Sequence, residues 1–114
     1  MSKARTYMLV FTNPLPGKED DYNRWYTDVH MPEILAVDGF VAAQRFKLSQ
    51  DQQLPEQQNH NYLAIYEIDT DRTAEALDNV MKAGPTMTME PVIDLTTPRV
   101  HVFETLTDLL QKKS

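Results

Sequence analysis

The residue types best suited to chemistry gather in one stretch, YNRWYTDVHMPE, which runs from Tyr22 to Glu33. It holds an imidazole, His30, and the carboxylate of Glu33 follows three residues later. A carboxylate that accepts a hydrogen bond from one imidazole nitrogen fixes the tautomer, which leaves the other nitrogen free to act as a general base or acid near neutral pH. Tyr26, one helical turn before His30, is placed to hold a substrate oxygen or a developing enolate. The pattern therefore predicts proton transfer at His30, oriented by Glu33 and assisted by Tyr26.

The same stretch also has the pattern of a helix core. Tyr22, Trp25, Tyr26 and Val29 recur at helical spacing with His30 at the flank of the stripe, and such a stripe is usually core. However, the Tyr, Trp and His side chains each bring a polar atom that needs a partner if it is buried, which favours a wet or ligand-filled cavity. Both interpretations stay open: Tyr22 and Trp25 bind a substrate beside a catalytic His30, or His30 pairs with a carboxylate for stability alone.

Pro32 interrupts the helix that carries this stripe. A proline inside a helix removes one backbone hydrogen bond and clashes with the carbonyl four residues earlier, here that of Asp28, at a cost of about 3 kcal/mol. We expect a kink or restart at Pro32 that displaces Glu33 from the regular stripe and allows it to face His30.

The elements that position these residues follow a recognisable order. Apolar and β-branched segments predict four strands, at residues 5–12, 40–49, 62–69 and 99–105. Helical spacing begins at Lys18. Thr70 or Asp71 is able to cap a second helix that reaches about Ala83, and we expect a short C-terminal helix. The order βαββαβ is that of a ferredoxin-like α+β fold, in which two helices cover one face of a four-stranded antiparallel sheet. We expect one such domain over residues 1–114.

Both faces of the predicted sheet are apolar. In the first strand Tyr7, Leu9 and Phe11 lie on one face while Met8 and Val10 lie on the other. Two helices can cover only one face, so we expect the other to meet the same face of a second chain in a homodimer.

Further candidate substrate-binding residues lie outside the helix. Arg45 has the reach to neutralise a carboxylate or enolate, although an exposed strand arginine is the alternative. Tyr7 and Tyr62 share a sheet face only if strand alternation is unbroken. Met87 belongs to a loop, residues 86–98, that is too apolar to be simply solvated and is expected to be a lid or part of the dimer contact.

The charge and hydropathy of the chain exclude two classes of partner. The formal net charge of -6 repels phosphate backbones, and the basic residues are scattered rather than clustered, so nucleic acid is not expected. No apolar run approaches the roughly 18 to 20 residues that cross a bilayer, so we expect no membrane partner and a cytoplasmic location.

Several kinds of chemistry find no support. The chain has no cysteine, which excludes thiolate nucleophiles, disulfides and zinc ribbons. His30 and Glu33 offer at most two metal ligands, so no bound metal is expected. The three glycines form no phosphate-binding loop.

The spacing of Trp25, His30 and Pro32, after a strand and a Pro-Gly turn, resembles the EthD-like branch of the dimeric α+β barrel proteins. The stretch GKEDDYNRWYTDVHMPEILAVDGFVAAQRF carries this resemblance, which is specific for the group but not for a reaction. It implies a dimer whose two sheets pack face to face, with a cavity between sheet and helices that His30 lines. Relatives in the wider superfamily include polyketide cyclases, muconolactone isomerases, cofactor-free monooxygenases and haem-degrading enzymes.

Three functions follow as hypotheses. The first is a lyase, isomerase or cyclase that needs no cofactor and transfers a proton through His30 on a hydrophobic, oxygenated ring or polyketide-like molecule. The second is a non-catalytic or accessory dimer that holds an apolar or aromatic small molecule in the same cavity. In the third, the aromatic helix is only core, and the protein works through its surface.

Overall fold

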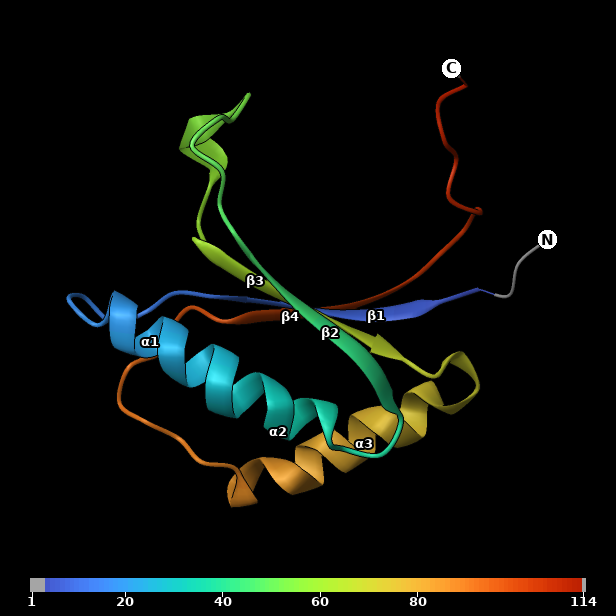
Figure 1. Ribbon diagram of the computed structural model, residues 1–114, viewed down its shortest axis with the longest axis horizontal. Helices are drawn as coiled ribbons and strands as arrows, with labels where there is room; N and C mark the ends of the chain where they lie inside the picture. The colour runs from blue at the N-terminus through green and yellow to red at the C-terminus, as the bar shows by residue number, and fades with distance from the viewer. Residues whose placement is uncertain (1–3, 114) are drawn as a thin grey trace.

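The computed structural model describes residues 4–113, in which four antiparallel strands form one sheet in the order β2-β3-β1-β4. All three α-helices lie on one side of this sheet (Figure 1). The arrangement confirms the ferredoxin-like α+β fold expected from the order of elements. The strands are β1 (Thr6–Thr12), β2 (Phe40–Lys47), β3 (Tyr62–Ile68) and β4 (Arg99–Glu104).

The first helical region is continuous but changes its winding. It consists of α1 (Glu19–Trp25), a π-helical segment η1 (Tyr26–His30) and α2 (Met31–Leu35). The Met31 amide donates to the Tyr26 carbonyl, the wider hydrogen bond of a π-turn. Since Pro32 has no amide and its ring needs room near the preceding turn, the wider turn accommodates it. The expected interruption at Pro32 is therefore a π-segment immediately before it.

The second helical region lies against the end of the first. It begins with the short 3-10 helix η3 (Thr70–Arg72), continues as α3 (Thr73–Ala83) and ends in a second 3-10 turn, η4 (Gly84–Thr86). The Asp69 carboxylate caps η3 by accepting from the Asp71 amide at 3.3 Å. This cap lies one residue before the positions that the sequence indicated.

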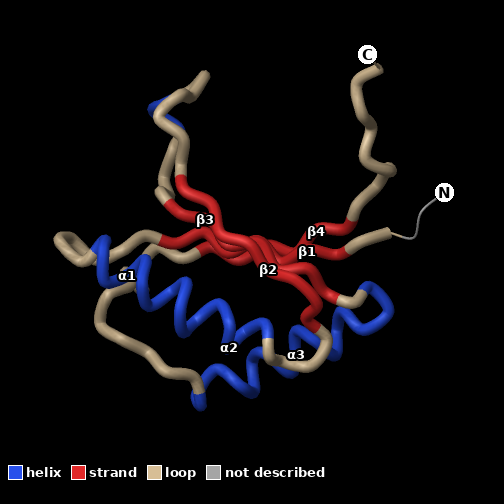
Figure 2. The backbone as a smooth tube through the Cα atoms, viewed as in Figure 1, coloured by secondary structure: helices blue, strands red, loops and turns tan. Residues whose placement is uncertain are grey.

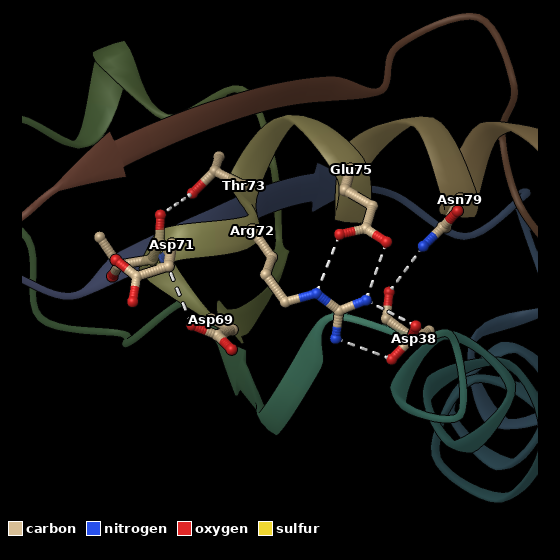
Figure 3. Close-up of polar contacts among 8 residues, drawn as sticks. Asp38, Asp69, Asp71, Arg72, Thr73, Glu75 and Asn79 are labelled. Carbon is tan, nitrogen blue, oxygen red and sulfur yellow. Dashed lines mark hydrogen bonds and ion pairs between the residues drawn. The ribbon is translucent and has the colours of Figure 1, made fainter.

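A group of polar residues, which we call the α3 junction, joins α3 to the loop before β2. The Arg72 guanidinium donates to both carboxylate oxygens of Asp38, at 3.0 and 2.6 Å, and to Glu75 at 2.9 and 3.0 Å. The Asn79 amide donates to the Asp38 carbonyl at 3.1 Å (Figure 3). Next to Asp38, Gly39 has a φ of 103° and packs closely against α3. The junction is thus both polar and tightly packed.

The core lies between the sheet and the helices. Strand alternation directs every second residue of β1 and β3 toward the helices, and the first helical region contributes its aromatic stripe. The buried apolar residues are Met8, Tyr22, Trp25, Tyr26, Ile34, Phe40, Ala64, Tyr66, Ile68, Ala76, Val92 and Ile93.

The opposite face of the sheet, which we call the outer face, carries the other half of the alternation. Tyr7, Leu9 and Phe11 of β1 lie there, while Phe46 and Phe103 on flanking strands are 39% and 60% exposed. In residues 4–113 no helix covers this face (Figure 1). The two-sided apolar pattern predicted from the sequence is therefore present.

Two segments extend away from the helices on the outer side of the sheet (Figure 2). One is the β2–β3 connection, residues 48–61, which includes η2 (Pro55–Gln57) and is called the hairpin arm. The other is the C-terminal tail, residues 105–113, which forms no helix. The prediction of a C-terminal helix was wrong because so short a helix is marginal in water without a surface to pack against.

Among the described residues, no helix has the length and apolar character that crossing a membrane requires.

Candidate functional site

The aromatic stripe of the first helical region is completely buried. Tyr22, Trp25 and Tyr26 are 0%, 1% and 1% exposed. Their rings meet edge to face, with centroids 5.6 Å apart in both the Tyr22–Tyr26 and Trp25–Tyr26 pairs. The stripe thus fills the space between helix and sheet, as the core interpretation requires.

His30 lies on the flank of this stripe. Its ring stacks on Trp25 at 4.6 Å with an interplanar angle of 16° and meets the edge of Tyr26 at 4.9 Å. Its Nδ1 is buried and has no hydrogen-bond partner in the described part of the chain. Burial lowers the pKa of His30 below the ordinary 6.5, although the charge of Glu33 acts in the opposite direction. The imidazole is therefore neutral at pH 7.

Glu33 does not form the expected hydrogen bond with His30. Its carboxylate accepts from the Thr88 amide at 3.0 and 3.2 Å and from the Thr88 hydroxyl at 3.3 Å, so it does not fix the His30 tautomer by a hydrogen bond. The correction has a physical reason: a backbone amide reaches Glu33 from another segment and takes both carboxylate oxygens. The influence of Glu33 on His30 is through its charge alone.

Thr88 belongs to a segment, residues 87–98, that we call the strap. The Thr88 carbonyl accepts a hydrogen bond from Trp25 Nε1 at 2.9 Å, and the Thr88 amide donates to Glu33. Thr88 therefore joins the strap to the first helical region through both its amide and its carbonyl. Met87 packs against the core. The strap is also held at its middle, where Leu15 donates to Val92 at 2.8 Å. No local sequence pattern indicated Thr88, since its partners lie more than fifty positions earlier.

Two tyrosine hydroxyls in the core interact with each other. The hydroxyls of Tyr26 and Tyr66 are buried, and neither has a hydrogen-bond partner of full geometry within residues 4–113, although the two phenols are close enough to interact. Burial raises the pKa of Tyr26 to about 12 and also raises the pKa of Tyr66, and each phenol affects the other. Both stay protonated at neutral pH. We refer to Tyr26 Oη, Tyr66 Oη and His30 Nδ1 as the polar cluster.

Arg45 reaches from β2 to the aromatic stripe. Its guanidinium lies over the ring of Tyr26 at 4.6 Å and near those of Tyr22 and Tyr62 at 5.4 and 5.5 Å. It donates to Thr27 Oγ1 at 2.8 Å and to the side chain of Asn23 at 2.9 Å. Arg45 is therefore half-buried and held by cation–π contacts rather than exposed on its strand.

The structure brings two of the predicted tyrosines together and separates a third. Tyr22 shares a hydrogen bond with Thr12, and Tyr62 donates to Glu19, both on the helix side of the sheet. Tyr7 pairs with Glu67 of β3 and lies on the outer face. Strand alternation thus places Tyr7 on the far side of the sheet from His30.

None of four surface cavities formed by residues 4–113 is the cavity expected in front of His30. These cavities are lined by strands, the hairpin arm or the C-terminal tail, and none of the four includes His30, Trp25 or Tyr26. The residues described contain no cluster of three or more His, Asp or Glu side chains able to hold a metal.

The arrangement nevertheless has defined chemical capacity. His30 offers a nitrogen that is able to accept a proton, and Tyr26, whose ring meets that of His30, carries a protonated phenol that is able to donate a hydrogen bond to an oxygen. Buried polar atoms without partners are uncommon in folded proteins and call for an explanation, which a ligand would supply.

Solved structures with similar folds come from several proteins. A mutant of MhuD bound to manganese protoporphyrin IX aligns at a TM-score of 0.62 and 14% identity, over 93% of this chain and 99% of that one. The heme-degrader MhuD from Mycobacterium tuberculosis, with two hemes bound, aligns at 0.59 and 16% over 91% and 98%. An ethyl tert-butyl ether (EthD) family protein from Bacillus halodurans aligns at 0.51 and 11% over 90% and 99%.

At such low identity these likenesses show the ferredoxin-like α+β fold alone and do not test the expected resemblance to the EthD-like proteins. No curated protein matches the sequence. Residues 9–108 match the family described as Domain of unknown function (DUF4286). Because that match covers most of the 114 residues, the chain belongs to the DUF4286 family.

Proposed function

We propose that the protein is a single-domain, EthD-like homodimer that binds a hydrophobic, oxygenated ring or polyketide-like molecule and transfers a proton on it through His30, without a cofactor. The observation that carries this proposal is the buried, unpartnered Nδ1 of His30, whose ring meets that of Tyr26 at 4.9 Å. Perturbed and unsatisfied groups of this kind concentrate at functional sites.

The proton moves as follows in this proposal. His30 Nδ1 takes a proton from a carbon next to a carbonyl, and the Tyr26 and Tyr66 hydroxyls donate hydrogen bonds to the oxygen as it gains negative charge. His30 then returns the proton to another atom of the same molecule. Arg45, under the ring of Tyr26, adds positive charge near that oxygen.

Access to His30 requires movement of the strap in this proposal. Thr88 is bonded to both Trp25 and Glu33, and Met87 packs beside it, so the strap covers the flank on which His30 lies. Tyr22, Trp25, Met87 and Tyr62 form the apolar surroundings of the ligand. In this proposal the strap acts as a lid over His30.

The outer face supports the proposed homodimer. Apolar side chains cover it, yet two of its phenylalanines are 39% and 60% exposed in the protomer. An exposed apolar face of this kind typically marks an interface. Two such faces meeting by two-fold symmetry would leave the helices outside.

A second candidate, a non-catalytic small-molecule-binding dimer, is favoured by a different observation. The aromatic stripe is fully buried, and His30 lines none of the four cavities, so a ligand would have to displace side chains or the strap. Binding without turnover needs no catalytic geometry at Nδ1.

The experiment begins with native mass spectrometry of the purified protein to identify a retained small molecule, with haem in the comparison panel because MhuD, which shares the fold, binds it. Turnover of that molecule is then measured for the wild type, His30→Gln and the control Lys82→Gln, which changes an exposed side chain of α3 away from both His30 and the outer face.

We expect His30→Gln to reduce turnover by roughly 100-fold or more, the usual contribution of a general base, while fold and dimer persist. The control should keep its turnover. Binding of the ligand with no turnover by the wild type would favour the second candidate. Turnover by the wild type that His30→Gln leaves unchanged would refute proton transfer through His30.

A further inference from the structure

The C-terminal tail and the hairpin arm leave the sheet at opposite ends of the strands. Lys47 and Tyr62, which flank the arm, pair with each other at the end of β1 marked by Thr12. Glu104, which precedes the tail, pairs with Thr6 at the other end of β1. Seven-residue strands separate these ends by about 20 Å. Both segments extend on the outer side of the sheet (Figures 1 and 2).

The tail presents an apolar surface that its own protomer leaves uncovered. Leu106, Leu109 and Leu110 are 97%, 85% and 94% exposed. The three leucines belong to no helix or strand and do not contribute to the core. Burial of these leucines against a second apolar surface would be stabilising, because it removes apolar surface from water.

A cleft at the base of the hairpin arm offers a surface of matching character. It has a volume of about 340 Å³, and Phe11, Phe46, Leu48 and Leu63 supply its apolar lining. Gln58 is among the polar residues at its rim. We call it the hairpin cleft.

We infer that in the homodimer the C-terminal tail of each protomer packs its three leucines into the hairpin cleft of the other. The inference rests on the dimer proposed above. Within one protomer the tail and the cleft lie at opposite ends of the sheet. When two outer faces meet about an axis that lies between the sheets and across the strands, each tail is carried to the partner's arm, and both contacts form at once.

The absence of cysteine from the chain allows a clean disulfide test. The double variant Leu109→Cys with Gln58→Cys is oxidised and compared with each single variant on non-reducing gels. We expect a covalent dimer from the double variant and none from either single variant. A covalent dimer from Leu109→Cys alone would show tail against tail, and a disulfide within one chain would place the tail on its own arm; either result overturns the inference.

Sedimentation equilibrium separates this inference from the proposed dimer. Replacing Leu106, Leu109 and Leu110 by Ser should raise the dimer dissociation constant at least about tenfold, equivalent to about 1.4 kcal/mol. A wild type that is monomeric at all concentrations refutes the dimer and the inference together. A dimer with unchanged affinity after the triple substitution refutes the inference alone.

Discussion

The α3 junction and the polar cluster both bring polar side chains together, but they differ in what satisfies them. At the junction Arg72 is bonded to the carboxylates of Asp38 and Glu75, and the Asp38 carbonyl accepts one further hydrogen bond, all within reach of solvent (Figure 3). In the polar cluster three buried atoms have no partner in the described chain. The hydrogen bonds of the junction are complete within the described chain, whereas those of the polar cluster are not.

The pKa shifts also differ between the α3 junction and the polar cluster. Hydrogen bonds and charge from Arg72 lower the pKa values of Asp38 and Glu75, which stabilises their charged forms. Burial instead shifts His30, Tyr26 and Tyr66 toward their neutral forms. Neutral groups that are able to exchange protons suit a site for a small molecule, and paired charges suit a fastening between elements.

The largest stability effect is expected at Gly39, beside the junction. Alanine there would place a Cβ 2.5 Å from that of Ala76, at a φ of 103°. The overlap and the strained backbone together should lower the free energy of unfolding by about 3 kcal/mol. Urea denaturation measures this.

Gly17→Ala is the matched control, since its φ is 77° but no atom lies within 4 Å of the new Cβ. Backbone strain alone should cost about 1 kcal/mol there. Equal costs at the two glycines would mean that the junction is not tightly packed.

Two core tyrosines provide the next test. Tyr22→Phe removes the hydrogen bond to the buried Thr12 and should cost about 1 to 3 kcal/mol, because the Thr12 hydroxyl loses its partner. Tyr66→Phe removes a hydroxyl that has no partner, and should change stability by less than about 1 kcal/mol.

Thermal denaturation of both variants compares the two losses of stability directly. Tyr66→Phe should in turn weaken ligand binding several-fold, since one hydrogen bond to the ligand oxygen is lost. If Tyr66→Phe destabilises the protein as much as Tyr22→Phe does, the Tyr66 hydroxyl is satisfied by protein and the contrast between the two regions fails.

The smallest effect is expected from Arg72→Gln, because the ion pairs it breaks are exposed. The ion pairs of Asp38 and Glu75 with Arg72 contribute to the free energy of unfolding above the ordinary pKa values of these carboxyl groups, 3.8 and 4.5. This contribution is lost as the pH falls through their lower pKa values in the folded protein. The difference in Tm between wild type and variant should therefore shrink from pH 7 to pH 3. A difference that grows toward acid pH would contradict the assigned pairing.

Local pattern was enough to predict the sheet and both helical regions. Alternation in β1 and β3 and the spacing of Tyr22, Trp25 and Tyr26 are properties of neighbouring residues, so they are visible in the sequence. The irregular winding before Pro32 was predictable for the same reason. The C-terminal helix was not, because its stability depends on a packing surface that the local pattern does not contain.

Long-range contacts account for what sequence reasoning missed at the site. Glu33 bonds to Thr88, 55 residues away, and not to its neighbour His30. Tyr66 meets Tyr26 only because β3 lies against the first helical region. Spacing identified His30, but its unpartnered state depends on these distant segments.

The central claim is that His30 is a neutral, half-buried base whose Nδ1 meets a ligand. Nitrogen NMR of ¹⁵N-labelled histidine, titrated with and without the retained ligand, tests it directly. The claim predicts a His30 pKa below 6.5, a neutral ring at pH 7 and a shifted Nδ1 signal when ligand binds. A His30 that is protonated at pH 7, or an Nδ1 signal unchanged at ligand saturation, would contradict it.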